Sequence, residues 1–239
     1  MGTIRTWARR IRTDWRDHWS PFERWWLLLF SLTNLLLFFA LDDTWIGLLA
    51  SLTGMMSVIL VAKRRISNYY YGIINILLYA WLSWHQQYYG EVMLNLLYYF
   101  PTQFIGLFLW RRHRTAPQSG EVRIRWLTNR ERVLWGTVAI LGTVAYGWFL
   151  ARISGALPYT DSFTTILSIV ATVLMLQRVP EQWILWILVD IATIAMWVRA
   201  LETGGGISMV VMWSAYLVNA VYGLVVWWRG APQRGEVAA

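Results

Sequence analysis

Two tryptophans and a carboxylate stand at helical spacing inside a long apolar run, residues 179–199. Trp183, Trp186 and Asp190 are separated by three and four positions, so a helix would place them on one face. Tryptophan rings stack on flat ligands and attract cationic ones, by about 2 kcal/mol when desolvated. An ionisable group this deep in an apolar segment is costly and by default indicates a functional site. Asp190 can accept hydrogen bonds from hydroxyl groups or balance a positive charge.

Further aromatic and amide side chains lie inside three other apolar runs. With the three residues above, we expect the substrate site to be lined by Asn75, Tyr79, Tyr99, Gln103, Tyr216, Asn219 and Tyr222. Asn and Gln present both donors and acceptors, which suits an amide group or ribose hydroxyls. The set therefore favours a flat, polar, aromatic ligand. The structural alternative is that Asn and Gln only bridge membrane helices, for about 0.6 kcal/mol each.

Catalytic and metal-binding patterns are weak in this sequence. His18, His85 and His113 all lie outside the apolar runs, and there is no cysteine. We find no His/Glu metal spacing, phosphate loop or nucleophile motif. We therefore expect a protein that is not an enzyme and that needs no cofactor or metal. A proton-coupling role for Asp190 is the weaker alternative, because no relay partner is evident.

The elements that must position these residues are membrane-spanning helices. Of the 239 residues, 57% are hydrophobic and only 14% are charged, against roughly 25% charged in soluble domains. Apolar runs near the length needed to cross a bilayer occupy residues 25–41, 44–62, 68–84, 90–110, 133–152, 162–177, 182–200 and 207–228. We predict an all-α polytopic membrane protein with about eight transmembrane helices.

The basic residues predict the topology. The net charge is +8, and nineteen of the twenty-one Lys and Arg residues fall in alternate connections when both termini are placed in the cytoplasm. This distribution fits the positive-inside rule better than a nucleic-acid surface, so no nucleic-acid partner is expected. Residues 1–24, rich in Arg and Trp, suit a helix lying on the lipid bilayer surface.

The two halves of the chain resemble each other. An offset of 115 pairs Asn75 with Asp190, and an offset of 117 pairs Gly106 with Gly223. The pattern predicts one N-terminal helix followed by a 3+1+3 parallel repeat, with substrate near the midplane between the repeats; chance similarity is the alternative. The expected divisions are a leader at 1–24, a first helix at 25–41, repeats at 44–110 and 161–229, a linking region at 111–160, and a tail at 230–239.

Several of these motifs resemble the PnuC-type vitamin transporters, whose best-known members carry nicotinamide riboside. They are Tyr71-Gly72-Ile73-Ile74-Asn75, Tyr89-Gly90-Glu91, the stripe of Gln103, Gly106 and Trp110, and the WxxW pair Trp183 and Trp186. The resemblance covers about residues 43–229. It implies an architecture similar to that of the SWEET sugar transporters, facilitated diffusion across the bacterial cytoplasmic (inner) membrane, and a homotrimer.

The resemblance also carries over site residues. It implies that Trp183 and Trp186 bind substrate, with Asn75, Gln103, Asp190, Asn219 and Tyr222 around it. Nicotinamide riboside is the leading candidate for the substrate. Relatives that carry thiamine or riboflavin leave the vitamin open, and a ligand sensor that does not transport is the alternative from another class.

Overall fold

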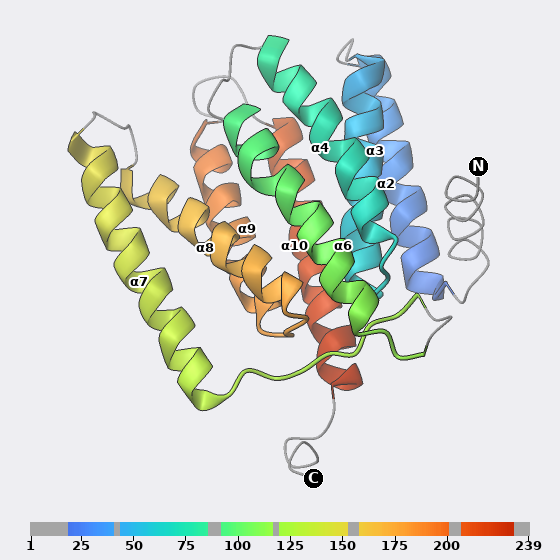
Figure 1. The fold of residues 1–239 in the computed structure, drawn as a ribbon. Helices are drawn as coiled ribbons and strands as arrows, with labels where there is room; N and C mark the ends of the chain where they lie inside the picture. Colours follow the sequence, from blue (N-terminus) through green and yellow to red (C-terminus); the bar gives the residue numbers. More distant parts are fainter. Residues whose placement is uncertain are drawn as a thin grey trace. The chain divides into compact units, whose positions relative to one another are not determined.

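In the part of the chain that the computed structural model describes, every regular element is helical (Figure 1). The structure describes residues 19–40, 44–85, 92–116, 120–152, 158–200 and 207–231. Its elements are α2 (Pro21–Ala40), α3 (Trp45–Ala62), α4 (Asn68–His85), η1 (Leu94–Tyr99), α6 (Phe100–Arg112), α7 (Asn129–Arg152), α8 (Pro158–Leu176), α9 (Gln182–Ala200) and α10 (Ile207–Gly230). The predicted all-α class is confirmed. The Tyr89-Gly90-Glu91 motif and most of the predicted leader and tail lie outside the described residues.

Five of these helices are long and apolar enough to cross a membrane: α2, α3, α7, α8 and α10. α9 contributes a shorter apolar stretch, Gln182–Met196. The helices left out of the five are α4, η1 with α6, and α9, which together carry Asn75, Gln103 and Asp190. The polar residues predicted to bind substrate thus lie on these helices and on α10, which carries Asn219, in a multi-pass membrane protein.

The chain forms two compact units that divide between Val122 and Arg123. In the first unit α2 packs on α3, α3 on α4, and α4 on η1 and α6. In the second unit α7 packs on α8, α8 on α9, and α9 on α10. Each unit is thus a series of helices in which neighbours along the chain are also neighbours in space, with α4 and α9 in corresponding positions.

The turns that precede α4 and α9 have the same structure. Arg64 and Arg178 both adopt the left-handed backbone conformation, with φ values of 59° and 62°. In the first turn, Arg65 N donates to Leu60 O and Arg64 N to Val61 O. In the second turn, Val179 N donates to Leu174 O and Arg178 N to Met175 O. Both are Schellman endings, with an arginine at the position that glycine usually fills.

These hydrogen bonds relate the two turns by 114 residues. The next hydrogen bonds agree with this offset, since the backbone N–H groups of Asn68 and Gln182 each donate to the carbonyl three residues earlier. The offset of 115 predicted for this helix pair is therefore one residue too long. At 114, Asn68 corresponds to Gln182 and Tyr69 to Trp183, so an amide matches an amide and an aromatic residue matches an aromatic one.

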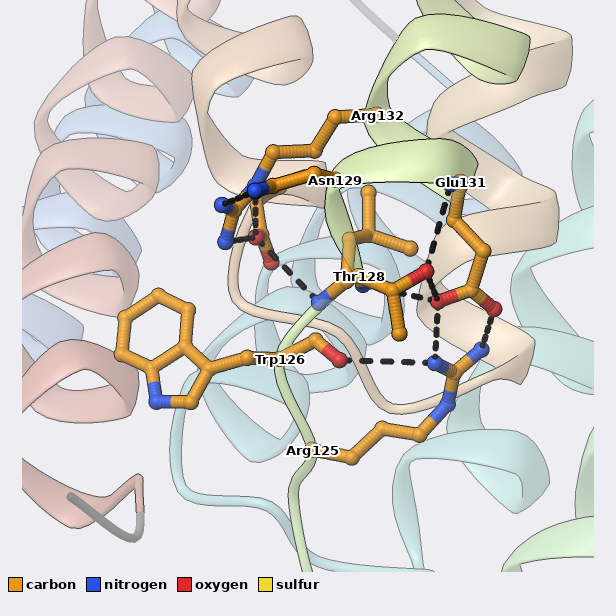
Figure 2. Close-up of polar contacts among 8 residues, drawn as sticks. Arg125, Trp126, Thr128, Asn129, Glu131 and Arg132 are labelled. Atoms are coloured by element: carbon orange, nitrogen blue, oxygen red, sulfur yellow. Dashed lines mark hydrogen bonds and ion pairs between the residues drawn. The ribbon is translucent and has the colours of Figure 1, made fainter. Parts of the chain in front are cut away.

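The first helix of each unit begins with a capping box. Ser20 and Glu23 exchange backbone-to-side-chain hydrogen bonds at the start of α2, and Thr128 and Glu131 do the same before α7 (Figure 2). Glu23 also forms a buried ion pair of 2.5 Å with Lys63, at the end of α3.

In the second unit, a hydrogen bond joins the equivalent parts of the chain, the segment just before α7 and the end of α8. Gln177, the counterpart of Lys63 at an offset of 114, accepts a 2.6 Å hydrogen bond from Arg125. The same guanidinium is paired with Glu131 at 2.9 Å (Figure 2). α2 and α7 thus hold similar places, each packed on the first of the three helices that follow it. This similarity supports a repeat that includes the first helix; the parallel 3+1+3 arrangement stays a prediction.

The segment between α6 and α7 runs along both turns. Before the division between the units, Gly120 O accepts from Ile66 N, and Val122 N donates to Arg64 O. After it, Arg125 N donates to Arg178 O, and Arg178 Nε donates to Arg123 O at 3.1 Å. Each turn therefore uses the carbonyl of its left-handed arginine to hold part of this segment.

Candidate substrate-binding site

The side chain of Trp183, on α9, packs tightly against α10. It is 3% exposed and meets the Trp227 ring edge-on, with the centroids 6.0 Å apart. A Cβ added at Gly223 would lie 2.5 Å from Trp183 Cζ2, so only glycine permits this approach. The first unit repeats the arrangement, because Tyr69 lies edge-on to Trp110 at 5.2 Å and over Gly106. Packing between helices thus accounts for the position of Trp183 without a ligand.

Trp186 lies one turn further along α9 and is half-buried. Its counterpart at an offset of 114 is Gly72, where an added Cβ would lie 2.5 Å from Gln103 Oε1. The counterpart of Gln103 at the α10 offset of 117 is Ala220. In the first unit the small residue, Gly72, is on α4 and the large one, Gln103, is on α6. In the second unit the large residue is on α9 and the small one is on α10. At this level the first unit presents an amide and the second a tryptophan.

Asp190 and Asn219 are buried polar residues of the second unit. Asp190 is 3% exposed, and within the described residues its carboxylate forms no hydrogen bond or ion pair. Asn219 is 2% exposed, and its Oδ1 likewise has no partner there. Buried polar groups are normally paired, so the Asp190 carboxylate and Asn219 Oδ1 are exceptions that call for an explanation.

The two amide residues predicted in the first unit have identifiable contacts. Asn75 Nδ2 donates to Ala50 O at 2.8 Å, which joins α4 to α3. Gln103 lies against Gly72, and its neighbour Thr102 donates to Tyr99 O at 2.7 Å. The amide of Asn75 is therefore partly used in holding helices together, as the structural alternative for such residues supposes.

The four predicted tyrosines have different surroundings. Tyr79 is 43% exposed, whereas Tyr99, Tyr216 and Tyr222 are half-buried. Tyr216 meets Trp213 edge-on, with the centroids 5.7 Å apart. The structure thus brings Trp183, Trp186, Asp190, Asn219, Tyr216 and Tyr222 together on the α9–α10 pair and Asn75, Tyr79, Tyr99 and Gln103 on α4, η1 and α6. That all ten residues bind substrate stays a prediction.

A π-helical turn places Tyr99 at the start of α6. Phe100 N donates to Asn95 O, five residues back, and Pro101 follows at the first turn of α6. Proline has no N–H and its ring clashes with the carbonyl four residues earlier, so it disturbs the regular α-helical pattern here. Such turns are frequent at functional sites, and this one also buries Asn95.

Gln182 is a further candidate, which was not predicted from the sequence. Its side chain is 0% exposed, and neither Oε1 nor Nε2 has a partner among the described residues. Gln182, Trp186 and Asp190 are spaced by four residues each, which on a helix places them on the same broad face as Trp183. That spacing was the available signal.

Comparisons with known proteins agree with this architecture. The family described as nicotinamide mononucleotide transporter matches residues 44–229. Two similar proteins, both named nicotinamide riboside transporter PnuC, come from Neisseria mucosa, at 41% identity over 87% of this chain and 81% of the relative, and Haemophilus influenzae, at 34% identity over 93% and 96%.

A solved structure supports the same relationship. The crystal structure of the vitamin B3 transporter PnuC matches with a TM-score of 0.78 and 38% identity, over 94% of this chain and 96% of that one. Sequence and fold thus agree over nearly the whole length of each protein. The chain belongs to the nicotinamide mononucleotide transporter family, as a relative of the PnuC proteins.

Proposed function

We propose that this protein carries nicotinamide riboside across the membrane by facilitated diffusion. The observation that carries the proposal is similarity over most of the chain to proteins named nicotinamide riboside transporter PnuC. The side chains of the second unit suit this ligand. Trp186 offers a ring for stacking, Asp190 a negative charge for the cationic pyridinium, and Asn219 an acceptor for a hydroxyl or amide group.

The charges favour the riboside over the mononucleotide. The mononucleotide carries a 5′-phosphate, which proteins usually bind with arginine, lysine or helix N-termini. No Lys, Arg or His occurs in residues 68–84, 92–110, 182–198 or 207–228, the parts of the helices that carry the predicted site. A phosphate at the level of Asp190 would also be repelled by its carboxylate. We therefore expect the mononucleotide to bind much more weakly than the riboside.

Calorimetric titration of the detergent-purified protein tests the substrate assignment. Nicotinamide riboside should bind, while nicotinamide mononucleotide, thiamine and riboflavin should bind weakly or not at all. Clear binding of thiamine or riboflavin without nicotinamide riboside would replace the substrate. Binding without exchange of labelled substrate in liposomes would indicate a sensor in place of a transporter.

We also propose the protein's setting. The positive-inside distribution supports cytoplasmic termini, and the bacterial relatives support the cytoplasmic membrane. The family resemblance supports a homotrimer. Light scattering of the detergent-purified protein, corrected for bound detergent, should give three times the 28.0 kDa of one chain; the mass of a monomer or dimer would contradict this assembly.

A further inference from the structure

The side-chain amide of Gln182 is buried and has no hydrogen-bond partner in the described residues. At the equivalent position of the first unit, the side-chain amide of Asn68 holds a turn together. Gln182 is 0% exposed, and both Oε1 and Nε2 lack partners within the residues that the structure describes. About nine in ten buried polar groups in proteins are hydrogen-bonded. A side chain with both ends unpaired therefore calls for an explanation beyond packing.

The equivalent residue of the first unit shows what an amide does here when it serves the fold. Asn68 is also buried, at 1% exposure, and its Nδ2 donates to Arg65 O at 2.6 Å, which closes the turn before α4. The corresponding carbonyl in the second unit is that of Val179, and the Gln182 side chain does not donate a hydrogen bond to it. The backbone of the turn is unchanged, so the amide of Gln182 is not needed to form it.

The position of Gln182 on α9 connects it with the proposed site. Gln182, Trp186 and Asp190 recur every four residues and share one face of the helix. Trp183 lies on the same side of α9 and packs on Gly223 and Trp227 of α10. The free amide thus lies one turn from the tryptophan that we propose to stack on the ligand ring.

We propose that Gln182 recognises the carboxamide of the nicotinamide ring and thereby sets specificity for the amide over the acid. This inference rests on the proposed function. An amide offers one acceptor and one N–H donor side by side, which pair with the N–H and the carbonyl of a carboxamide. A carboxylate in the same place has no N–H to offer, so Oε1 of Gln182 would face an oxygen atom. Sites built on paired hydrogen bonds reject analogues that leave a buried group unpaired.

Two substitutions test this assignment in the full-length purified protein. Gln182→Met keeps the length and shape of the side chain but removes both polar atoms. Gln182→Asn shortens it to the residue found at Asn68, so that the amide can bond to Val179 O in place of a ligand. Asn68→Met is the matched control, because it removes the same group from the equivalent turn.

The measurements are the affinities for nicotinamide riboside and nicotinic acid riboside, together with the melting temperature of the unliganded protein. Both Gln182 variants should lose about tenfold in affinity for nicotinamide riboside and most of the discrimination against the acid. Their melting temperatures should stay level or rise, because an unpaired buried group has been removed or paired. Asn68→Met should lower the melting temperature and leave the ratio of the two affinities unchanged.

The outcomes separate the two proposals. If the unmodified protein does not bind nicotinamide riboside, the proposed function fails. If it binds, but both Gln182 variants keep the same ratio of affinities for amide and acid, the assignment of Gln182 is overturned. An equal loss of affinity for both ligands, or a lowered melting temperature with an unchanged ratio, also assigns Gln182 to structure and overturns the proposal.

Discussion

At the scale of single residues, the side chains of the predicted site differ in whether contacts within the fold account for their positions. Asn75, which is half-buried, joins two helices. Trp183 fills the space over Gly223, although its Nε1 also has no partner among the described residues. Asp190 and Asn219 have polar atoms that the described part of the protein leaves unpaired. A group of this kind lowers the stability of the unliganded protein, so its presence in the helices of a transporter is best explained by a ligand.

Removing the Trp186 ring or the unpaired oxygen of Asn219 should weaken substrate binding. Trp186→Ala and Asn219→Ala should each cost about 1–3 kcal/mol of binding free energy, measured by titration calorimetry with nicotinamide riboside. Trp25→Ala is a suitable control, because that side chain is 71% exposed on α2. Unchanged affinity in both site variants would mean that the pocket lies elsewhere.

Asp190 should favour binding of a cationic ligand over an uncharged ligand of the same shape. Asp190→Asn keeps the shape of the side chain and removes its negative charge, so it should weaken binding of the cationic nicotinamide riboside by about 1–3 kcal/mol. Dihydronicotinamide riboside has nearly the same shape but an uncharged ring, and its affinity should change much less. Equal losses for the two compounds in a competition assay would assign Asp190 to hydrogen bonding and not to charge balance.

At the scale of elements, close contact between helices depends on particular glycines. Gly223→Ala would force a Cβ into the Trp183 ring, so α9 and α10 must separate, at about 1–3 kcal/mol of unfolding free energy. Thermal unfolding in detergent should show a lower melting temperature and weaker substrate binding.

Gly136 provides the matched control for this substitution. It lies within α7, and a Cβ there would meet nothing within 4 Å. Gly136→Ala should raise stability by up to about 1 kcal/mol, because alanine is the better helix former. The same loss of stability in both variants would show that the packing of Trp183 is not the cause.

The sequence predicted the helices well and their ends less well. The apolar runs matched the helices, but α7 begins at Asn129 and α8 at Pro158, four residues before the predicted 133 and 162. A capping box and an N-terminal proline start these helices within polar segments, which a criterion of apolar length does not detect.

The sequence was also incomplete as a guide to the site. The offset of 115 misaligned α4 with α9 because it was not anchored on the turns, where Arg64 and Arg178 set the register. Gln182 was overlooked because burial and missing partners are properties of the folded protein. The π-helical turn before Pro101 depends on hydrogen-bond geometry in the same way.

At the scale of the whole molecule, two units with similar helix order and equivalent turns differ in the side chains they bury. Where the first has Gly72 beside Gln103, the second has Trp186 and Ala220, and Asp190 has no acidic counterpart in α4. Units with the same order of helices thus bury different side chains, an amide on α6 in the first and a tryptophan and a carboxylate on α9 in the second.

Counterflow in liposomes made with the purified protein tests the central claim most directly. With unlabelled nicotinamide riboside inside, labelled nicotinamide riboside should accumulate transiently, and a protonophore should not change its rate or extent. Facilitated diffusion requires both results, because the substrate gradient alone drives the exchange. A steep loss on adding the protonophore would favour proton coupling, with Asp190 as the candidate site. No accumulation with folded protein that binds the substrate would contradict the proposed transport itself.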